Sequence, residues 1–134
     1  MPLNPTFLLI EDNLIDQLVI KQLFKKVLGI DQVHLANNGK EGLQWLFYNL
    51  ETCTPLIILL DIQMPIMNGF DFLKTFDQFD EKYKNDIQIY VLSSTLDQDE
   101  IDEITKNKYV QKMLSKPFPI EEFKDKFYLN ITAS

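Results

Sequence analysis

Acidic side chains follow two of the most apolar segments of this 134-residue chain. Glu11 and Asp12 come directly after residues 7–10, and Asp61 directly follows residues 56–60. A carboxylate beside a buried segment is costly unless something compensates its charge. Three carboxylates brought together would also repel one another and raise their pKa values. A divalent cation with oxygen ligands relieves this repulsion, and Mg²⁺ is the usual choice where phosphate is also present.

Asp61 also has the chemistry of a phosphoryl acceptor, because a carboxylate attacks phosphorus to give an aspartyl-phosphate. In-line transfer of this kind needs a metal ion and a cation around the moving oxygens. Ser93 follows the apolar segment 89–92, and Lys116 follows the segment 110–114. Together, Mg²⁺ and Lys116 would balance the three acids, so the site would be neutral until a phosphoryl group arrives.

The elements that position these residues are predicted from apolar spacing. Uninterrupted apolar runs are typical of strands buried on both faces, as in parallel sheets. We predict strands at 7–10, 32–36, 56–60, 89–92 and 110–114, and helices at 13–28, 39–49, 69–82, 98–106 and 120–129. Their alternation predicts an α/β fold, a doubly wound parallel sheet with helices on both faces. Sites in such sheets form beyond the carboxyl ends of the strands, where the acids, the hydroxyl and the lysine would meet.

Trp45, His34 and Cys53 lie outside this group and are interpreted as structural. The second helix is predicted to face inward through Leu43, Leu46, Phe47 and Leu50. Trp45 falls off that stripe and is interpreted as a packing residue. His34, the only histidine, and Cys53, the only cysteine, are assigned no chemical role.

Composition limits the class of protein. The net charge is −7 and every basic residue is a lysine, which argues against direct binding of nucleic acid. The four glycines form no phosphate-binding loop. A single cysteine, no signal peptide and no apolar run long enough for a bilayer predict a cytoplasmic protein without membrane insertion. The length suits one domain, residues 1–134.

These residues, taken in order, resemble the receiver domain of two-component response regulators over essentially the whole chain. The matching segments are Glu11-Asp12, the stretch DIQMPIMNG that begins at Asp61, Ser93, and SKPF with Lys116 and Pro117. Each segment alone is weakly specific, but their order and their places at strand ends make the combination strong. The resemblance implies a flavodoxin-like fold, with five strands in the order 2-1-3-4-5 and five helices.

The resemblance also implies residue roles. Asp61 would be the phosphoacceptor. Mg²⁺ would be bound by Glu11, Asp12 and Asp61, and by the backbone carbonyl of Gln63. Ser93 would reorient to donate a hydrogen bond to a phosphoryl oxygen, and Lys116 would pair with the phosphoryl group, with a cis peptide bond following it.

Three positions depart from the family pattern. Glu11 stands where an aspartate is commoner, and Ser93 stands where a threonine is commoner. Met113 occupies a position at which the family often has a switch tyrosine or phenylalanine. Tyr109 and Phe118 are the nearby candidates for that aromatic role.

The implied function is a signalling receiver rather than a turnover enzyme, with intrinsic self-phosphorylation and self-dephosphorylation chemistry. Its expected partners are a histidine kinase or phosphotransfer protein as donor and a downstream target protein. We expect a monomer or weak homodimer without an output domain. Two alternatives stay open: an interaction module that takes no phosphate, and an aspartyl-phosphate phosphohydrolase. The second is disfavoured because such enzymes need an acid where Gln63 stands.

Overall fold

The computed structural model describes residues 5–64, 66–94 and 96–132, with side chains described as far as residue 126. In this part of the chain, parallel strands form one five-stranded sheet in the order β2-β1-β3-β4-β5. The strands are β1 (Thr6–Ile10), β2 (His34–Ala36), β3 (Leu56–Asp61), β4 (Ile87–Ser93) and β5 (Val110–Ser115). The predicted fold and strand order are therefore confirmed.

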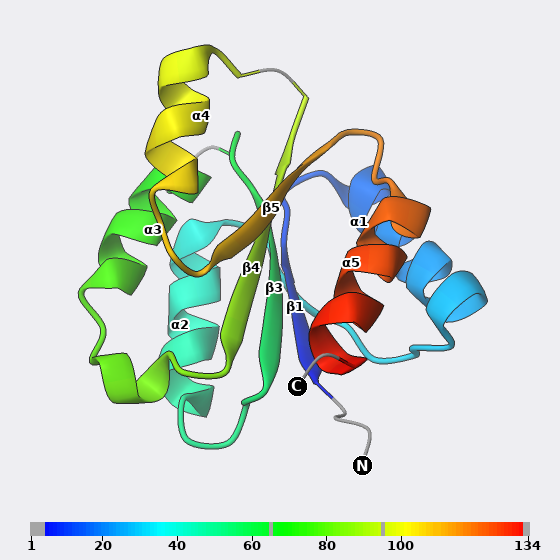
Figure 1. Ribbon diagram of the computed structural model, residues 1–134, viewed down its shortest axis with the longest axis horizontal. Helices are drawn as coiled ribbons and strands as arrows, with labels where there is room; N and C mark the ends of the chain where they lie inside the picture. Colours follow the sequence, from blue (N-terminus) through cyan, green and yellow to red (C-terminus); the bar gives the residue numbers. More distant parts are fainter. Residues whose placement is uncertain (1–4, 65, 95, 133–134) are drawn as a thin grey trace.

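Helices cover both faces of the sheet (Figure 1). They are α1 (Leu14–Leu23), α2 (Gly39–Asn49), α3 (Gly69–Asp77), α4 (Gln98–Thr105) and α5 (Ile120–Thr132). In Figure 1, α2, α3 and α4 lie on one side of the sheet, and α1 and α5 lie on the other. This two-sided cover explains why all six residues of β3 are buried and why its sequence does not alternate.

Side-chain caps fix where four helices begin. Asn13, Asn38, Asn68 and Asp97 each accept a hydrogen bond from the backbone N–H three residues later. At the far end of α1 the helix continues as a π-helical turn and stops at Gly29, whose φ of 69° is left-handed. Both ends agree with the helix predicted at 13–28.

Two apolar cores lie on opposite faces of the sheet. Phe72, Phe76 and Ile104 belong to the core under α2, α3 and α4. Phe24 and Phe123 belong to the core under α1 and α5, with ring centroids 5.4 Å apart. The sheet is thus held rigid from both sides, which fixes the positions of its strand ends.

The third helix is shorter than predicted. It was expected to reach residue 82, but α3 ends at Asp77 and a separate 3₁₀ turn covers Glu81–Tyr83. Asp80 starts this turn by accepting a hydrogen bond from the N–H of Lys82 at 3.0 Å. An acid that caps a new turn competes with continuation of the old helix, and apolar periodicity does not reveal this.

The inward face of α2 was also predicted incorrectly at one position. Phe47 is 71% exposed, whereas Leu46 is fully buried. Trp45, predicted to lie off the stripe, packs against the core, and its ring centroid lies 5.1 Å from that of His34. The buried stripe is therefore rotated toward residue 45. No helix among the described residues is long and apolar enough to cross a membrane.

Candidate functional site

The predicted site residues meet at one edge of the sheet. Glu11 directly follows β1, Asp61 is the last residue of β3, and Ser93 is the last residue of β4. Strand register aligns these ends, since Ile10 pairs with Leu60 in the parallel ladder. The carboxyl ends of the strands thus form the site edge that is expected for a doubly wound sheet.

Three carboxylates form a cluster at this edge. Glu11, Asp12 and Asp61 each offer an oxygen, and these oxygens all lie within 4.8 Å of one another. Glu11 is 0% exposed and Asp61 is 1% exposed, whereas Asp12 faces solvent. Hard oxygen donors with one side open to solvent suit a hydrated divalent cation such as Mg²⁺. The donor set therefore fits the metal that the sequence predicts.

Lys116 supplies the positive charge of the cluster. Its Nζ lies 3.1 Å from Glu11 Oε1 and 3.2 Å from Asp61 Oδ2. Partial burial alone would lower the pKa of Lys116, but its interactions with Glu11 and Asp61 outweigh burial, and the pKa lies above its ordinary value. The following peptide bond, to Pro117, is cis, as the sequence resemblance implied. The backbone N–H of Lys116 donates to the carbonyl of Ser93 at 3.0 Å, which ties β5 to β4 at this point.

Glu11 carries the clearest sign of electrostatic stress. The pKa of its carboxyl is raised from 4.5 to about 7. Burial is the largest cause of this shift, and the neighbouring Asp61 also contributes to it. The backbone N–H of Asn13, which donates to Glu11 Oε2 at 3.1 Å, and Lys116 offset part of the effect. One ammonium therefore does not fully compensate the buried acids, and a cation has a favourable place beside them.

The hydroxyl of Ser93 is buried without a hydrogen-bond acceptor among the described residues. Asp61 Oδ1 accepts a hydrogen bond from the backbone N–H of Gln63 at 3.1 Å, which orients the carboxylate. The side-chain Oε1 of Gln63 accepts a hydrogen bond from Ser94 Oγ at 3.1 Å. An unpaired buried hydroxyl costs free energy, so the hydroxyl of Ser93 would be stabilised by an acceptor that binds at this edge.

Comparison with known proteins decides the family. The model of the response regulator receiver domain matches residues 7–128. The chain belongs to the response regulator receiver family. Over 117 residues, or 87% of its length, this receiver is 31% identical to the probable C4-dicarboxylate response regulator DctR of Bacillus subtilis, 48% of which is covered. It is 30% identical over 114 residues, or 85% of its length, to the sensor kinase/phosphatase LuxN of Vibrio campbellii, 12% of which is covered.

Solved structures agree with this assignment at the level of the fold. A two-component response regulator from Cytophaga hutchinsonii superposes with a TM-score of 0.84 at 22% identity, over 97% of this chain and 98% of that chain. A two-component response regulator from Legionella pneumophila gives a TM-score of 0.79 at 26% identity, over 98% and 100% of the two chains. The receiver spans less than half the length of the curated relatives DctR and LuxN, so the matched region alone is shared with them.

The departures from the family pattern have clear structural settings in this receiver. Met113 is half-buried and lines a hollow between α4 and β5 together with Ser93 and Ile101. Tyr109 lies before the start of β5, where its hydroxyl donates to Glu81 at 2.9 Å. Phe118 is buried against Phe24 and Phe123 in the other core. Neither candidate aromatic residue lines the hollow beside Ser93, and Met113 is the side chain that does.

Sequence reasoning missed two residues of the first helix. Asp16 was not predicted as a site residue, yet its Oδ2 lies 3.5 Å from Lys116 Nζ. Gln17 was given no role, yet it is 5% exposed and donates to the backbone carbonyl of Glu11. A signal for Gln17 exists in the sequence, because it falls on the same helix face as the buried Ile20 and Phe24. A polar residue on an apolar stripe needs hydrogen-bond partners.

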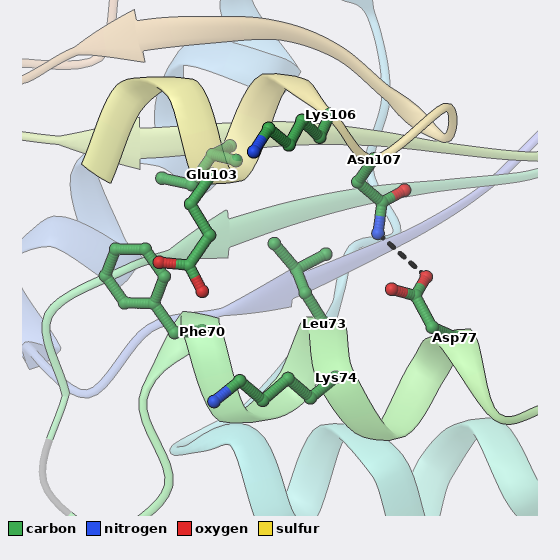
Figure 2. A pocket seen from close by; sticks show the side chains of 8 residues that line it. Phe70, Leu73, Lys74, Asp77, Glu103, Lys106 and Asn107 are labelled. Atoms are coloured by element: carbon green, nitrogen blue, oxygen red, sulfur yellow. Dashed lines mark hydrogen bonds between the residues drawn. The ribbon is translucent and has the colours of Figure 1, made fainter. Parts of the chain in front are cut away.

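A second hollow lies away from the acidic edge, between α3 and α4 (Figure 2). Phe70, Leu73 and Ile104 contribute its apolar lining, and Asn107 Nδ2 donates to Asp77 Oδ1 at 2.9 Å. Its volume of about 140 Å³ is below the ~300–1,000 Å³ that small-molecule sites usually occupy. This hollow is therefore smaller than a typical small-molecule site.

Proposed function

We propose that this receiver accepts a phosphoryl group on Asp61 from a phosphohistidine-bearing donor protein. The observation that carries the proposal is the position of Lys116, with its ammonium 3.2 Å from Asp61 Oδ2 beside a cluster of three acids. Mg²⁺ would be held by Glu11, Asp12, Asp61 and the backbone carbonyl of Gln63. When bound, Mg²⁺ would neutralise charge on the transferring phosphoryl oxygens.

A magnesium-bearing relative supports the choice of metal. The receiver domain of the sensor histidine kinase PA1611 from Pseudomonas aeruginosa was solved with a magnesium ion coordinated in its active-site cleft. That domain superposes on this chain with a TM-score of 0.73 at 22% identity. The oxygen donors at the present site have the hardness and charge that the same ion prefers.

The residues divide the work of transfer between them. A carboxylate oxygen of Asp61 forms the bond to phosphorus while the bond between phosphorus and the donor's imidazole nitrogen breaks. The electron pair of the broken bond returns to the imidazole. Lys116 then pairs with a phosphoryl oxygen, and the hydroxyl of Ser93 donates a hydrogen bond to another. The new charge thus gives the buried hydroxyl of Ser93 the acceptor that it lacks.

The exposed face of α1 supports a protein donor over a small molecule. Four aliphatic side chains of this helix are between 46% and 71% exposed: Leu14, Ile15, Leu18 and Val19. The helix begins immediately after the acidic pair, so this apolar face flanks the site. Contiguous exposed apolar surface rimmed by polar groups is typical of protein–protein contacts. A donor with a complementary apolar surface would bring its phosphohistidine to Asp61.

The output follows from the elements that carry Ser93 and Lys116. Ser93 ends β4 just before α4, and Lys116 lies between β5 and α5. Movement of these two side chains would shift an existing equilibrium of the face formed by α4, β5 and α5. That face would bind or release a downstream target in the cytoplasm, with the receiver a monomer or weak homodimer.

A phosphoryl mimic tests this proposal. Beryllofluoride with Mg²⁺ is added to isotopically labelled wild type and to Asp61→Asn, and backbone amide shifts are recorded. We expect shifts at Asp61 and through residues 93–118 in wild type and no response in the variant. Absence of binding in wild type would favour the interaction module, and repeated turnover of a phosphate ester would favour the phosphohydrolase.

A further inference from the structure

Gln17 joins the acidic loop to a neighbouring loop from inside the protein. Its side chain is 5% exposed, and Nε2 donates to the carbonyl of Glu11 at 2.6 Å and to Asn37 Oδ1 at 2.9 Å. Both hydrogens of the amide are therefore used, as a buried amide requires. The proposed phosphoryl transfer assigns no role to the buried amide of Gln17.

The carbonyl that Gln17 binds is part of the peptide unit between Glu11 and Asp12. Because a peptide unit is planar, fixing this carbonyl also fixes the direction in which the chain enters Asp12. The carboxylate of Asp12 is exposed and makes no hydrogen bond or ion pair with another described residue. Its position relative to Glu11 and Asp61 therefore depends on the backbone that Gln17 holds.

The network continues across residues 37–39, which we call the β2–α2 bridge. Asn37 donates through its backbone N–H and through Nδ2 to Glu41 Oε1, at 3.1 and 3.2 Å. Asn38 caps α2 by accepting from the N–H of Glu41 at 2.9 Å. The backbone N–H of Gly39 donates to the carbonyl of Met67 at 3.0 Å, in the loop that follows Asp61. The bridge thus connects the loop of the acidic pair to the loop of the phosphoacceptor.

The contact at Gly39 leaves no room for a side chain. A Cβ atom at this position would lie 2.7 Å from the carbonyl oxygen of Met67 and 2.7 Å from its Cγ. The two loops are therefore held at a spacing that even a methyl group would change. Loop spacing decides how far Asp12 lies from Asp61, and hence how well both can serve one small cation.

We propose that Gln17, acting through the β2–α2 bridge, is a positioning residue that sets the Mg²⁺ affinity of the carboxylate cluster. The inference rests on the proposed function, since it concerns the same site. Groups that hold the ligands of a metal site typically contribute ~10–100-fold to metal affinity. Gln17 would do so without touching the ion.

The test is calorimetric titration of Mg²⁺ into wild type, Gln17→Met and Gln22→Met. The first variant removes both donors but keeps the length of the side chain, and the second makes the same change at an exposed position of α1. We expect the dissociation constant for Mg²⁺ to rise ~10–100-fold in Gln17→Met and to stay unchanged in Gln22→Met. Unfolding measured in chelator verifies that both variants fold. In a variant that still folds, a loss of stability alone would not change the affinity for Mg²⁺.

Asn37→Ala provides a second route, because Asn37 is exposed and its loss removes one acceptor of Gln17. We expect weaker Mg²⁺ binding here as well, and this variant decides the matter if Gln17→Met does not fold. Folded variants that bind Mg²⁺ as tightly as wild type would overturn the inference and leave the proposed function intact. Wild type that binds no Mg²⁺ would instead contradict the proposed function itself.

Discussion

The ammonium of Lys116 lies 3.2 Å from Asp61 Oδ2 and is shared with Glu11 Oε1 at 3.1 Å. One cation thus faces two buried acids, and apart from Lys116 neither of these oxygens has a hydrogen-bond partner among the described residues. A buried ion pair of this kind contributes little net stability, so its presence is better explained by a functional role. Here the unbalanced charge prepares the edge of the sheet for a metal ion and a phosphoryl group.

Asp61→Asn should stabilise the metal-free protein while abolishing phosphorylation. The substitution removes one of two acids that compete for Lys116, so the pKa of Glu11 should also fall toward its ordinary value. We expect the free energy of unfolding in chelator to rise by about 0.5–2 kcal/mol, as is common when a strained functional site is relaxed. Urea unfolding measures the change, with Asp31→Asn in an exposed loop as the control. A clear loss of stability in Asp61→Asn would show that the acid is structural.

The stability of the metal-free protein should depend on the ionisation of Glu11. Burial, the largest cause, raises the pKa of Glu11 from 4.5 to about 7 in the folded state. The folded state therefore retains a proton that the unfolded chain releases, and this contribution to stability is full below pH 4.5 and is lost as pH rises toward 7. Unfolding by urea at several pH values in chelator measures it. Glu11→Gln should flatten this part of the profile, and an unchanged profile would contradict the raised pKa.

Ser93→Ala should separate stability from phosphoryl recognition. The hydroxyl of Ser93 is buried without a described hydrogen-bond partner, so its removal should change the free energy of unfolding by less than about 0.5 kcal/mol. A lost hydrogen bond to a charged acceptor costs about 1.5–3 kcal/mol, so binding of beryllofluoride should weaken by roughly 10–150-fold. Fluorescence or NMR titration measures the affinity. Equal affinities in wild type and variant would remove Ser93 from the site.

The exposed face of α1 should matter for a protein donor only. Leu18→Lys places a charge on a side chain that is 64% exposed, and should slow transfer from a phosphohistidine protein by at least tenfold. Transfer from a small acyl phosphate should be unaffected. Phe47→Lys, at a 71% exposed position of α2, is the matched control. Equal slowing by both substitutions, or slowing with both donors, would argue against α1 as the donor surface.

Local patterns were sufficient to predict most of the fold and the residues that meet at its edge. Apolar runs located β1, β3, β4 and β5, and because parallel strands align their carboxyl ends, Glu11, Asp61, Ser93 and Lys116 could be expected together. The sequence did not reveal the end of α3, because the cap that starts the next turn competes with helix continuation over only a few residues. The sequence prediction also placed Phe47 inside, whereas the observed rotation of α2 exposes Phe47 and packs the partly buried Trp45 against the core.

Contacts between distant loops were beyond sequence reasoning. Asp16 and Lys116 are 100 residues apart in the chain, and their approach depends on how α1 and β5 sit on the sheet. Gln17 and Asn37 meet only because β1 and β2 are neighbours. These polar contacts follow from the tertiary structure, although the polar interruption at Gln17 was visible on an otherwise apolar helix face.

Direct phosphotransfer tests the central claim that Asp61 accepts the phosphoryl group. A phosphorylated histidine kinase or phosphotransfer protein is mixed with wild type and with Asp61→Asn in Mg²⁺, and the site of the label is mapped by mass spectrometry. We predict one acid-stable, base-labile acyl phosphate on Asp61, lost in the variant and in chelator. Label that persists undiminished in Asp61→Asn, or that maps to another residue in wild type, would contradict the account.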